Sequence, residues 1–87
     1  MSRSNENIAW YTPSEWVKVR AVSSDPDSMG LTYEEWLHGV EALKKQLEAG
    51  GAAVSKVYID AEALLAFARR AGHRLIDNSV RTEFTIS

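Results

Sequence analysis

The sequence contains no cysteine, only two prolines and no long apolar run. Without cysteine, the chain has no disulfide framework, no thiolate chemistry and no cysteine-based zinc site. A transmembrane helix needs about 20 predominantly apolar residues, so we expect no membrane-spanning segment. The first ten residues, MSRSNENIAW, also lack the apolar stretch of a secretion signal. These absences predict a cytoplasmic protein that does not bind a membrane.

The chain also lacks a strong charge of either sign, because ten basic residues stand against twelve acidic ones and the net charge is −2. Such a balance gives no overall attraction to nucleic acid or to an anionic membrane. The composition, 45% hydrophobic and 25% charged, is ordinary for a globular protein. Because its beginning is polar, we expect residues 1–9 to be a flexible segment and residues 10–87 to form a single small globular domain.

The clearest helix signal lies in LTYEEWLHGVEALKKQLEAG, residues 31–50. Thr32 and Glu35 form a capping box at its start, and Leu31 and Trp36 stand where a hydrophobic staple is expected. Apolar residues then recur at spacings of three and four, which gives an apolar stripe along one face. Two consecutive glycines supply the left-handed residue that ends a helix. This pattern predicts a long amphipathic helix that needs a partner for its stripe.

A similar start signal, YTPSEWV, predicts a helix over residues 13–22. Thr12 is the expected cap, a proline occupies the first helical position, and Glu15 closes the capping box. The valines that follow favour a strand by propensity, but the start signal favours a helix. Trp16 falls at the same staple position as Trp36 in the second helix, so both tryptophans are expected to be structural.

The segment after the two glycines is expected to be extended over residues 54–59, where apolar and polar residues alternate. A lone strand cannot satisfy its own backbone groups, so this segment needs a pairing partner or is only an extended connection. Asp60 opens a third predicted helix, which Gly72 ends.

Asp77 is the expected cap of a short fourth helix that runs to about Phe84. The alternative is a strand near residues 82–86, because polar and apolar residues alternate there; it would pair with the extended segment or across a dimer. We therefore predict a mostly α fold, a small bundle of three to four short helices. It includes one short extended segment at 54–59, whose pairing as a strand is left open, with an α+β fold as the alternative.

No catalytic or metal-binding constellation is recognisable. His38 and His73 lie far apart, with no further ligand at metal-binding spacing. The acidic loop around Asp25 and Asp27 lacks the calcium-loop pattern, and the chain has neither a glycine-rich phosphate loop nor a nucleophile elbow. We therefore expect no catalytic residue, no metal and no cofactor, and we interpret the protein as not being an enzyme.

Eight aromatic residues in so short a chain indicate either a rich core or an interaction surface. Trp10 and Tyr58 have no obvious inward position, so they are the candidate partner-binding residues, together with Tyr11 and Lys56. This predicts an apolar patch near Trp10 and Tyr58. The expected function is a small interaction or regulatory module that binds an unidentified protein partner or associates with itself, with a homodimer as one form.

Positive charge gathers toward the C-terminus. Four arginines and two acidic residues give residues 63–87 a net charge of +2, whereas six basic and ten acidic residues give residues 1–62 a net charge of −4. A helix, a turn containing glycine and a second short helix are also the parts of a helix-turn-helix. The alternative function is therefore nucleic-acid binding by four arginines: Arg69, Arg70, Arg74 and Arg81.

Overall fold

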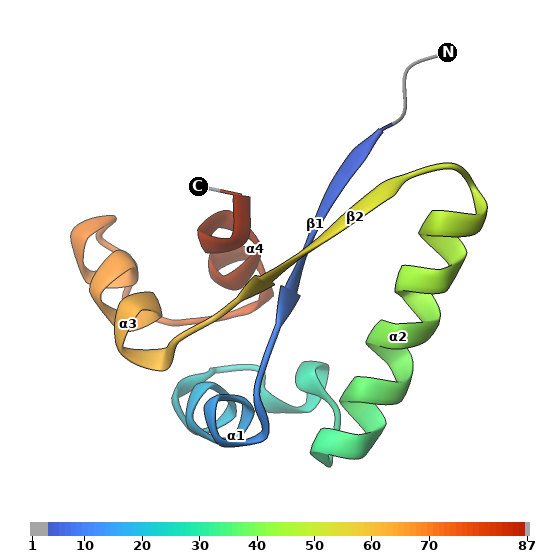
Figure 1. Ribbon diagram of the computed structural model, residues 1–87. Helices are drawn as coiled ribbons and strands as arrows, with labels where there is room; N and C mark the ends of the chain where they lie inside the picture. The colour runs from blue at the N-terminus through green and yellow to red at the C-terminus, as the bar shows by residue number, and fades with distance from the viewer. Residues whose placement is uncertain (1–3, 87) are drawn as a thin grey trace.

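The computed structural model describes residues 4–86, and these residues form four α-helices, one short 3-10 helix and a two-stranded parallel sheet (Figure 1). The elements in chain order are β1 (Asn5–Trp10), α1 (Pro13–Val22), the 3-10 helix η1 (Pro26–Met29), α2 (Tyr33–Ala49), β2 (Ala53–Tyr58), α3 (Ala61–Arg70) and α4 (Asn78–Ile86). The predicted fold class, a mostly α fold with few and short helices, is confirmed. The extended segment does pair as a strand.

The helices begin where their capping residues predict. Thr12, Thr32 and Asp60 each accept a hydrogen bond from the backbone amide three residues further on, at 3.3, 3.1 and 3.0 Å. The carboxylate of Glu15 does not close the capping box of its own helix, because its Oε1 accepts the amide hydrogen of Ala61, at 2.8 Å. Glu15 therefore ties α1 to the first turn of α3, and this contact holds the pKa of the carboxyl below its ordinary value.

Two glycines with positive φ set the ends of α2. Gly51, which follows the C-cap residue Gly50, has φ +95°, which confirms the predicted stop. Gly30 has φ +85° before the helix, and a Cβ there would lie 3.2 Å from the backbone nitrogen of Trp36. A side chain at residue 30 is therefore disfavoured both by the backbone conformation and by space.

The strands β1 and β2 run parallel and pair over their full length, from Asn5 opposite Ala53 to Trp10 opposite Tyr58. A parallel pair needs a long crossover connection, and here α1, η1 and α2 provide it. In Figure 1, α2 lies on one side of the strand pair, and α3 and α4 lie on the other side. Helices thus flank the sheet on both faces, while its outer edges carry no further strand within residues 4–86.

Two expectations about strands and flexible segments are corrected by the structure. The flexible segment expected at residues 1–9 is wrong for residues 5–9, which belong to β1, while residues 1–3 lie outside the described part of the chain. The polar start of β1 misled the prediction, because its side chains are exposed and its partner strand lies far along the chain. The alternative strand near residues 82–86 is also wrong, since these residues belong to α4.

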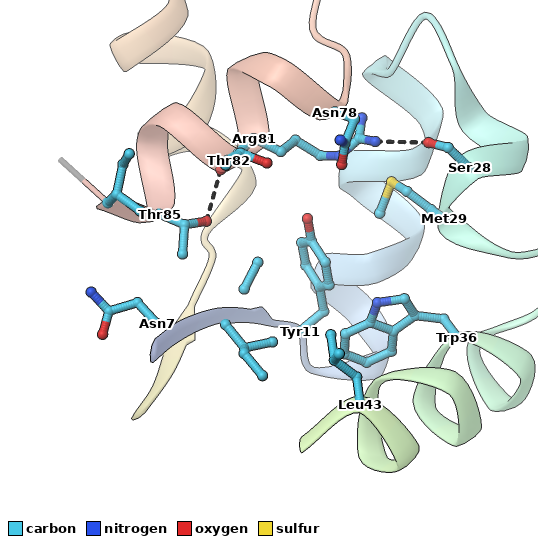
Figure 2. Close-up of a pocket in the computed structure, with 13 residues that line it drawn as sticks. Asn7, Tyr11, Ser28, Met29, Trp36, Leu43, Asn78, Arg81, Thr82 and Thr85 are labelled. Atoms are coloured by element: carbon cyan, nitrogen blue, oxygen red, sulfur yellow. Dashed lines mark hydrogen bonds between the residues drawn. The ribbon is translucent and has the colours of Figure 1, made fainter. Parts of the chain in front are cut away.

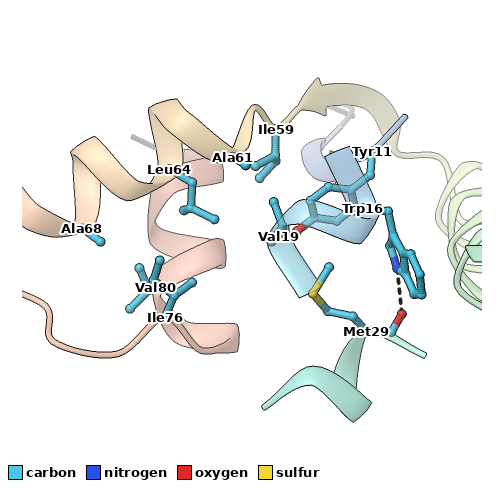
Figure 3. Close-up of a cluster of buried hydrophobic side chains, with 10 residues drawn as sticks. All are labelled: Tyr11, Trp16, Val19, Met29, Ile59, Ala61, Leu64, Ala68, Ile76 and Val80. Atoms are coloured by element: carbon cyan, nitrogen blue, oxygen red, sulfur yellow. Dashed lines mark hydrogen bonds between the residues drawn. The ribbon is translucent and has the colours of Figure 1, made fainter. Parts of the chain in front are cut away.

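The core lies where α1, α3 and α4 meet below the sheet (Figure 3). Val19 and Leu64 are fully buried at its centre. Trp16 is buried as predicted, and its indole Nε1 donates a hydrogen bond to the carbonyl oxygen of Met29 at 3.0 Å. Leu31, by contrast, is 65% exposed, so the staple expected at the start of α2 does not form.

We expect Leu64→Ala to lower the free energy of unfolding by about 3 kcal/mol, because it leaves a cavity at a fully buried position of the core. Urea unfolding followed by tryptophan fluorescence measures this change. The matched control is Leu75→Ala, at a leucine that is 65% exposed, which should change the stability by less than about 0.5 kcal/mol. Equal effects at the two positions would contradict the position of the core.

Candidate functional site

An open groove of about 280 Å³ runs beside strand β1, between α2 and α4 (Figure 2). The strand contributes three consecutive residues, Asn7, Ile8 and Ala9. Helix α2 contributes the apolar side chains of Trp36 and Leu43. The groove is therefore lined by a strand along its length and by helix side chains on both sides.

The hydrogen bonds of the sheet show which backbone groups of β1 face this groove. The carbonyl oxygens of Ser4 and Trp10 accept hydrogen bonds from the first and last paired amides of the β2 side, at 2.8 and 2.9 Å. Because pairing alternates along a parallel strand, every second residue between them also faces β2. The amides and carbonyls of Asn5, Asn7 and Ala9 therefore face away from β2. Within residues 4–86, no hydrogen bond reaches these outward groups.

The two faces of β1 meet different helices. Trp10 faces α2, since its ring lies 5.7 Å from the ring of Trp36 in an edge-on arrangement. Ile8, two residues earlier, shares this face. Asn7 and Ala9 lie on the opposite face, and Ala9 packs against the core. The groove therefore follows the open edge of β1, whose side chains point alternately toward α2 and toward α4.

The wall on the α4 side is polar but uncharged over most of its length. Asn78, Thr82 and Thr85 line the groove, with Ile86 at the end of the helix. The hydroxyl of Thr85 is buried and donates a hydrogen bond to the carbonyl oxygen of Arg81 at 2.7 Å. No histidine or carboxylate is among the lining residues. The groove can thus offer hydrogen bonds and apolar contact to a neutral ligand.

Arg81 fixes the position of this wall. Its side chain is 5% exposed, and the guanidinium contacts Asp25 at 2.8 Å and donates hydrogen bonds to the hydroxyls of Ser23 and Ser28. The second carboxylate oxygen of Asp25 accepts the amide hydrogen of Asn78 at the start of α4, at 2.9 Å. The hydrogen bond from Arg81 holds the pKa of Asp25 below its ordinary value of 3.8. This cluster clamps α4 against the loop after α1.

Arg81 is therefore not available to nucleic acid, and its place among the candidate arginines is corrected. The sequence pattern showed an arginine on a short helix, and such a residue is usually exposed. The other three, Arg69, Arg70 and Arg74, are exposed at and after the end of α3. His73, directly before Arg74, has its Nε2 3.2 Å from a carboxylate oxygen of Glu83.

The candidate partner-binding residues separate into two pairs. Trp10 and Tyr11 are 5% and 3% exposed, so the expectation that they form a surface patch is wrong. They pack against Trp36, at ring distances of 5.7 and 5.1 Å, and this contact depends on a helix that the local sequence cannot place. Tyr58 and Lys56 are exposed on β2, and the Nζ of Lys56 lies 4.3 Å from the ring centre of Trp10.

Burial also raises the pKa of the Tyr11 hydroxyl at the inner end of the groove. Among residues 4–86, no group of three or more histidine, aspartate or glutamate side chains is placed to hold a metal ion. No helix in this part of the chain is both long and apolar enough to cross a bilayer.

The groove itself was not predicted from the sequence. Its only sequence signal is the spacing of Asn78, Thr82 and Thr85 along one face of α4.

No protein-family model, no curated protein and no solved structure matches this chain.

We expect Arg81→Met to lower the free energy of unfolding by about 2–3 kcal/mol at pH 7, because Asp25 then loses its cation. Since the pKa of Asp25 is depressed in the folded state, the contribution of the pair is complete above the ordinary value of 3.8 and is lost as the pH falls through the lower folded value. Urea unfolding at pH 7 and near pH 2 should therefore show a difference that shrinks in acid. Arg74→Met, at an exposed arginine, is the matched control and should change little at either pH.

Proposed function

We propose that this protein is an interaction module that binds an extended segment of a protein partner along the outer edge of β1, in the cytoplasm. One observation carries the proposal: the outward backbone groups of Asn5, Asn7 and Ala9 lie along a strand edge that opens into a groove. Extended peptides bind such edges by adding a strand, with main-chain hydrogen bonds supplying affinity and alternate side chains supplying specificity.

The walls of the groove fit an added strand. Its side chains would point alternately to the two faces of the sheet, as in any strand. On one face they would meet the apolar side of α2 at Trp36 and Leu43, and on the other the exposed polar side chains of Asn78 and Thr82. This supports a partner segment in which apolar residues alternate with small polar ones.

The small size of the sheet supports the same proposal. Parallel sheets are normally covered on both faces and contain more strands than two, and a two-stranded sheet has little stability of its own. Here the first half of β1 is exposed on both faces, from Asn5 to Asn7. A third strand would extend the backbone pairing of the sheet and cover this exposed half.

A photo-crosslinking residue at Thr82 tests the proposal in the native host. We expect Thr82→p-benzoylphenylalanine to give a covalent adduct with a protein partner, because this position lines the groove. The same substitution at Ala66, an exposed position on α3 outside the groove, is the matched control and should give none. Absence of an adduct at Thr82, or equal adducts at both positions, would contradict the proposal.

Nucleic-acid binding is the second proposal, and the exposure of Arg69, Arg70 and Arg74 at one end of α3 supports it. Phosphate contacts of this kind are salt-dependent, so binding of labelled DNA or RNA should weaken as salt rises. We expect replacement of the three arginines by alanine to abolish binding at low salt, measured by fluorescence anisotropy. The charge-matched control replaces Lys18, Lys44 and Lys45 by alanine and should retain binding. If the unmodified chain gives no anisotropy change at low salt, this proposal fails.

A further inference from the structure

We propose that the segment bound along β1 is β1 of a second copy of this chain, paired antiparallel across a two-fold axis at Asn7. This inference rests on the proposed function, because it names the partner that occupies the same edge. The product is a continuous four-stranded sheet with β1 of each copy in the middle and β2 of each copy outside. Dimers with such two-fold symmetry use the same surface on both subunits.

The register follows from the outward groups of β1. In an antiparallel pair, residues whose backbone groups face each other exchange two hydrogen bonds per pair. An axis at Asn7 sets Asn7 opposite its own counterpart, and sets Asn5 of each copy opposite Ala9 of the other. All three outward residues of both strands are then paired, so no outward amide or carbonyl of β1 is left without a partner.

The neighbouring registers are worse for identifiable reasons. An axis at Glu6 sets the two glutamates directly opposite each other, and like charges in this arrangement are destabilising. An axis at Ile8 sets Asn5 opposite Tyr11, which lies beyond the strand and is buried. With the axis at Asn7, Glu6 of each copy instead faces Ile8 of the other, and two asparagine amides meet at the centre.

Charge complementarity supports the same register. Lys56 pairs with Ile8 within one copy, so Glu6 of the second copy falls in the same row of the sheet, on the other side of Ile8. Lys56 and Glu6 of the second copy are thus two strand spacings apart, about 9.6 Å, and their two side chains together can span this distance. Within a single copy, Glu6 forms no ion pair with any residue of the described chain. The dimer brings an opposite charge within its reach.

The helices beside the groove fit this arrangement. A two-fold axis perpendicular to the sheet keeps both copies of α2 on one face and both copies of α4 on the other. Leu43 on α2 and Ile86 on α4 line the groove, and they are 44% and 67% exposed in the single chain. Each approaches the corresponding helix of the second copy, so both apolar side chains gain cover. Exposed apolar residues beside an open strand edge are thus explained by one contact.

A cysteine at the axis tests the geometry directly, because the chain has no native cysteine. We expect Asn7→Cys to form a covalent dimer under mild oxidation, since opposed Cα atoms in such a pair are about 5.5 Å apart and a disulfide spans roughly 4.4–6.8 Å. Asn5→Cys is the matched control on the same strand. Its two copies lie about 13 Å apart along the strands, so it should stay monomeric on a denaturing gel.

Sedimentation of the unmodified chain and of charge variants completes the test. We expect a monomer–dimer equilibrium whose dissociation constant rises about fivefold or more in Asn7→Lys, which sets two lysines opposite each other. Asn5→Lys, which faces Ala9 of the other copy, should leave the constant nearly unchanged.

A strictly monomeric chain up to millimolar concentration overturns this inference. A dimer that crosslinks equally through both cysteine positions, or through neither, also overturns it. These outcomes are distinct from a failure of the proposed function, because that is decided separately by the identity and presence of adducts at Thr82. If Thr82 gives an adduct with a different protein and the chain is monomeric, the proposed function stands. The second copy is then rejected as the segment that binds along β1.

Discussion

The parallel pairing of β1 with β2 is the constraint on which the rest of the structure depends. No tight turn can join parallel strands, so α1, η1 and α2 form the crossover connection between them. Closing so long a connection costs conformational entropy. Contacts at the carboxyl end of the sheet offset this cost. Tyr11 and Ile59 follow directly after the two strands, and both are buried in the core. The sheet is thus anchored at one end, while its other end, from Asn5 to Asn7, reaches into solvent.

The anchoring depends in turn on a buried charge. Arg81 sits on the side of α4 that turns toward β1, where an apolar residue would be the simpler choice. Its guanidinium has two hydroxyls and one carboxylate as partners, all from residues 23–28, which follow α1 and include part of η1, so both of its terminal nitrogens are hydrogen-bonded. This fixes the rotation of α4, with Val80 and Phe84 against the core and the threonines beside the strand edge. The shape of the groove follows from that rotation.

Local chemistry predicted the helices well, because caps and stop signals act over a few residues. Thr12, Thr32 and Asp60 form the expected hydrogen bonds, and α2 ends at its two glycines. The strand β1, the burial of Trp10 and the pairing of Arg81 were not predictable in this way. Each depends on a partner far along the chain, whose direction is set only when the core assembles. The candidate site could not be predicted from local sequence for the same reason, since the groove forms only between elements that are distant along the chain.

The two open edges of the sheet differ in a way that bears on which one binds a partner. Natural sheets protect free edges with lysine, proline or a covering element. The outward residues of β2 include Lys56, an exposed lysine. The outward residues of β1 are two asparagines and an alanine, without charge or proline, and they face a groove rather than a covering helix. Of the two edges, β1 therefore lacks the features that prevent strand addition and has the walls that would guide it.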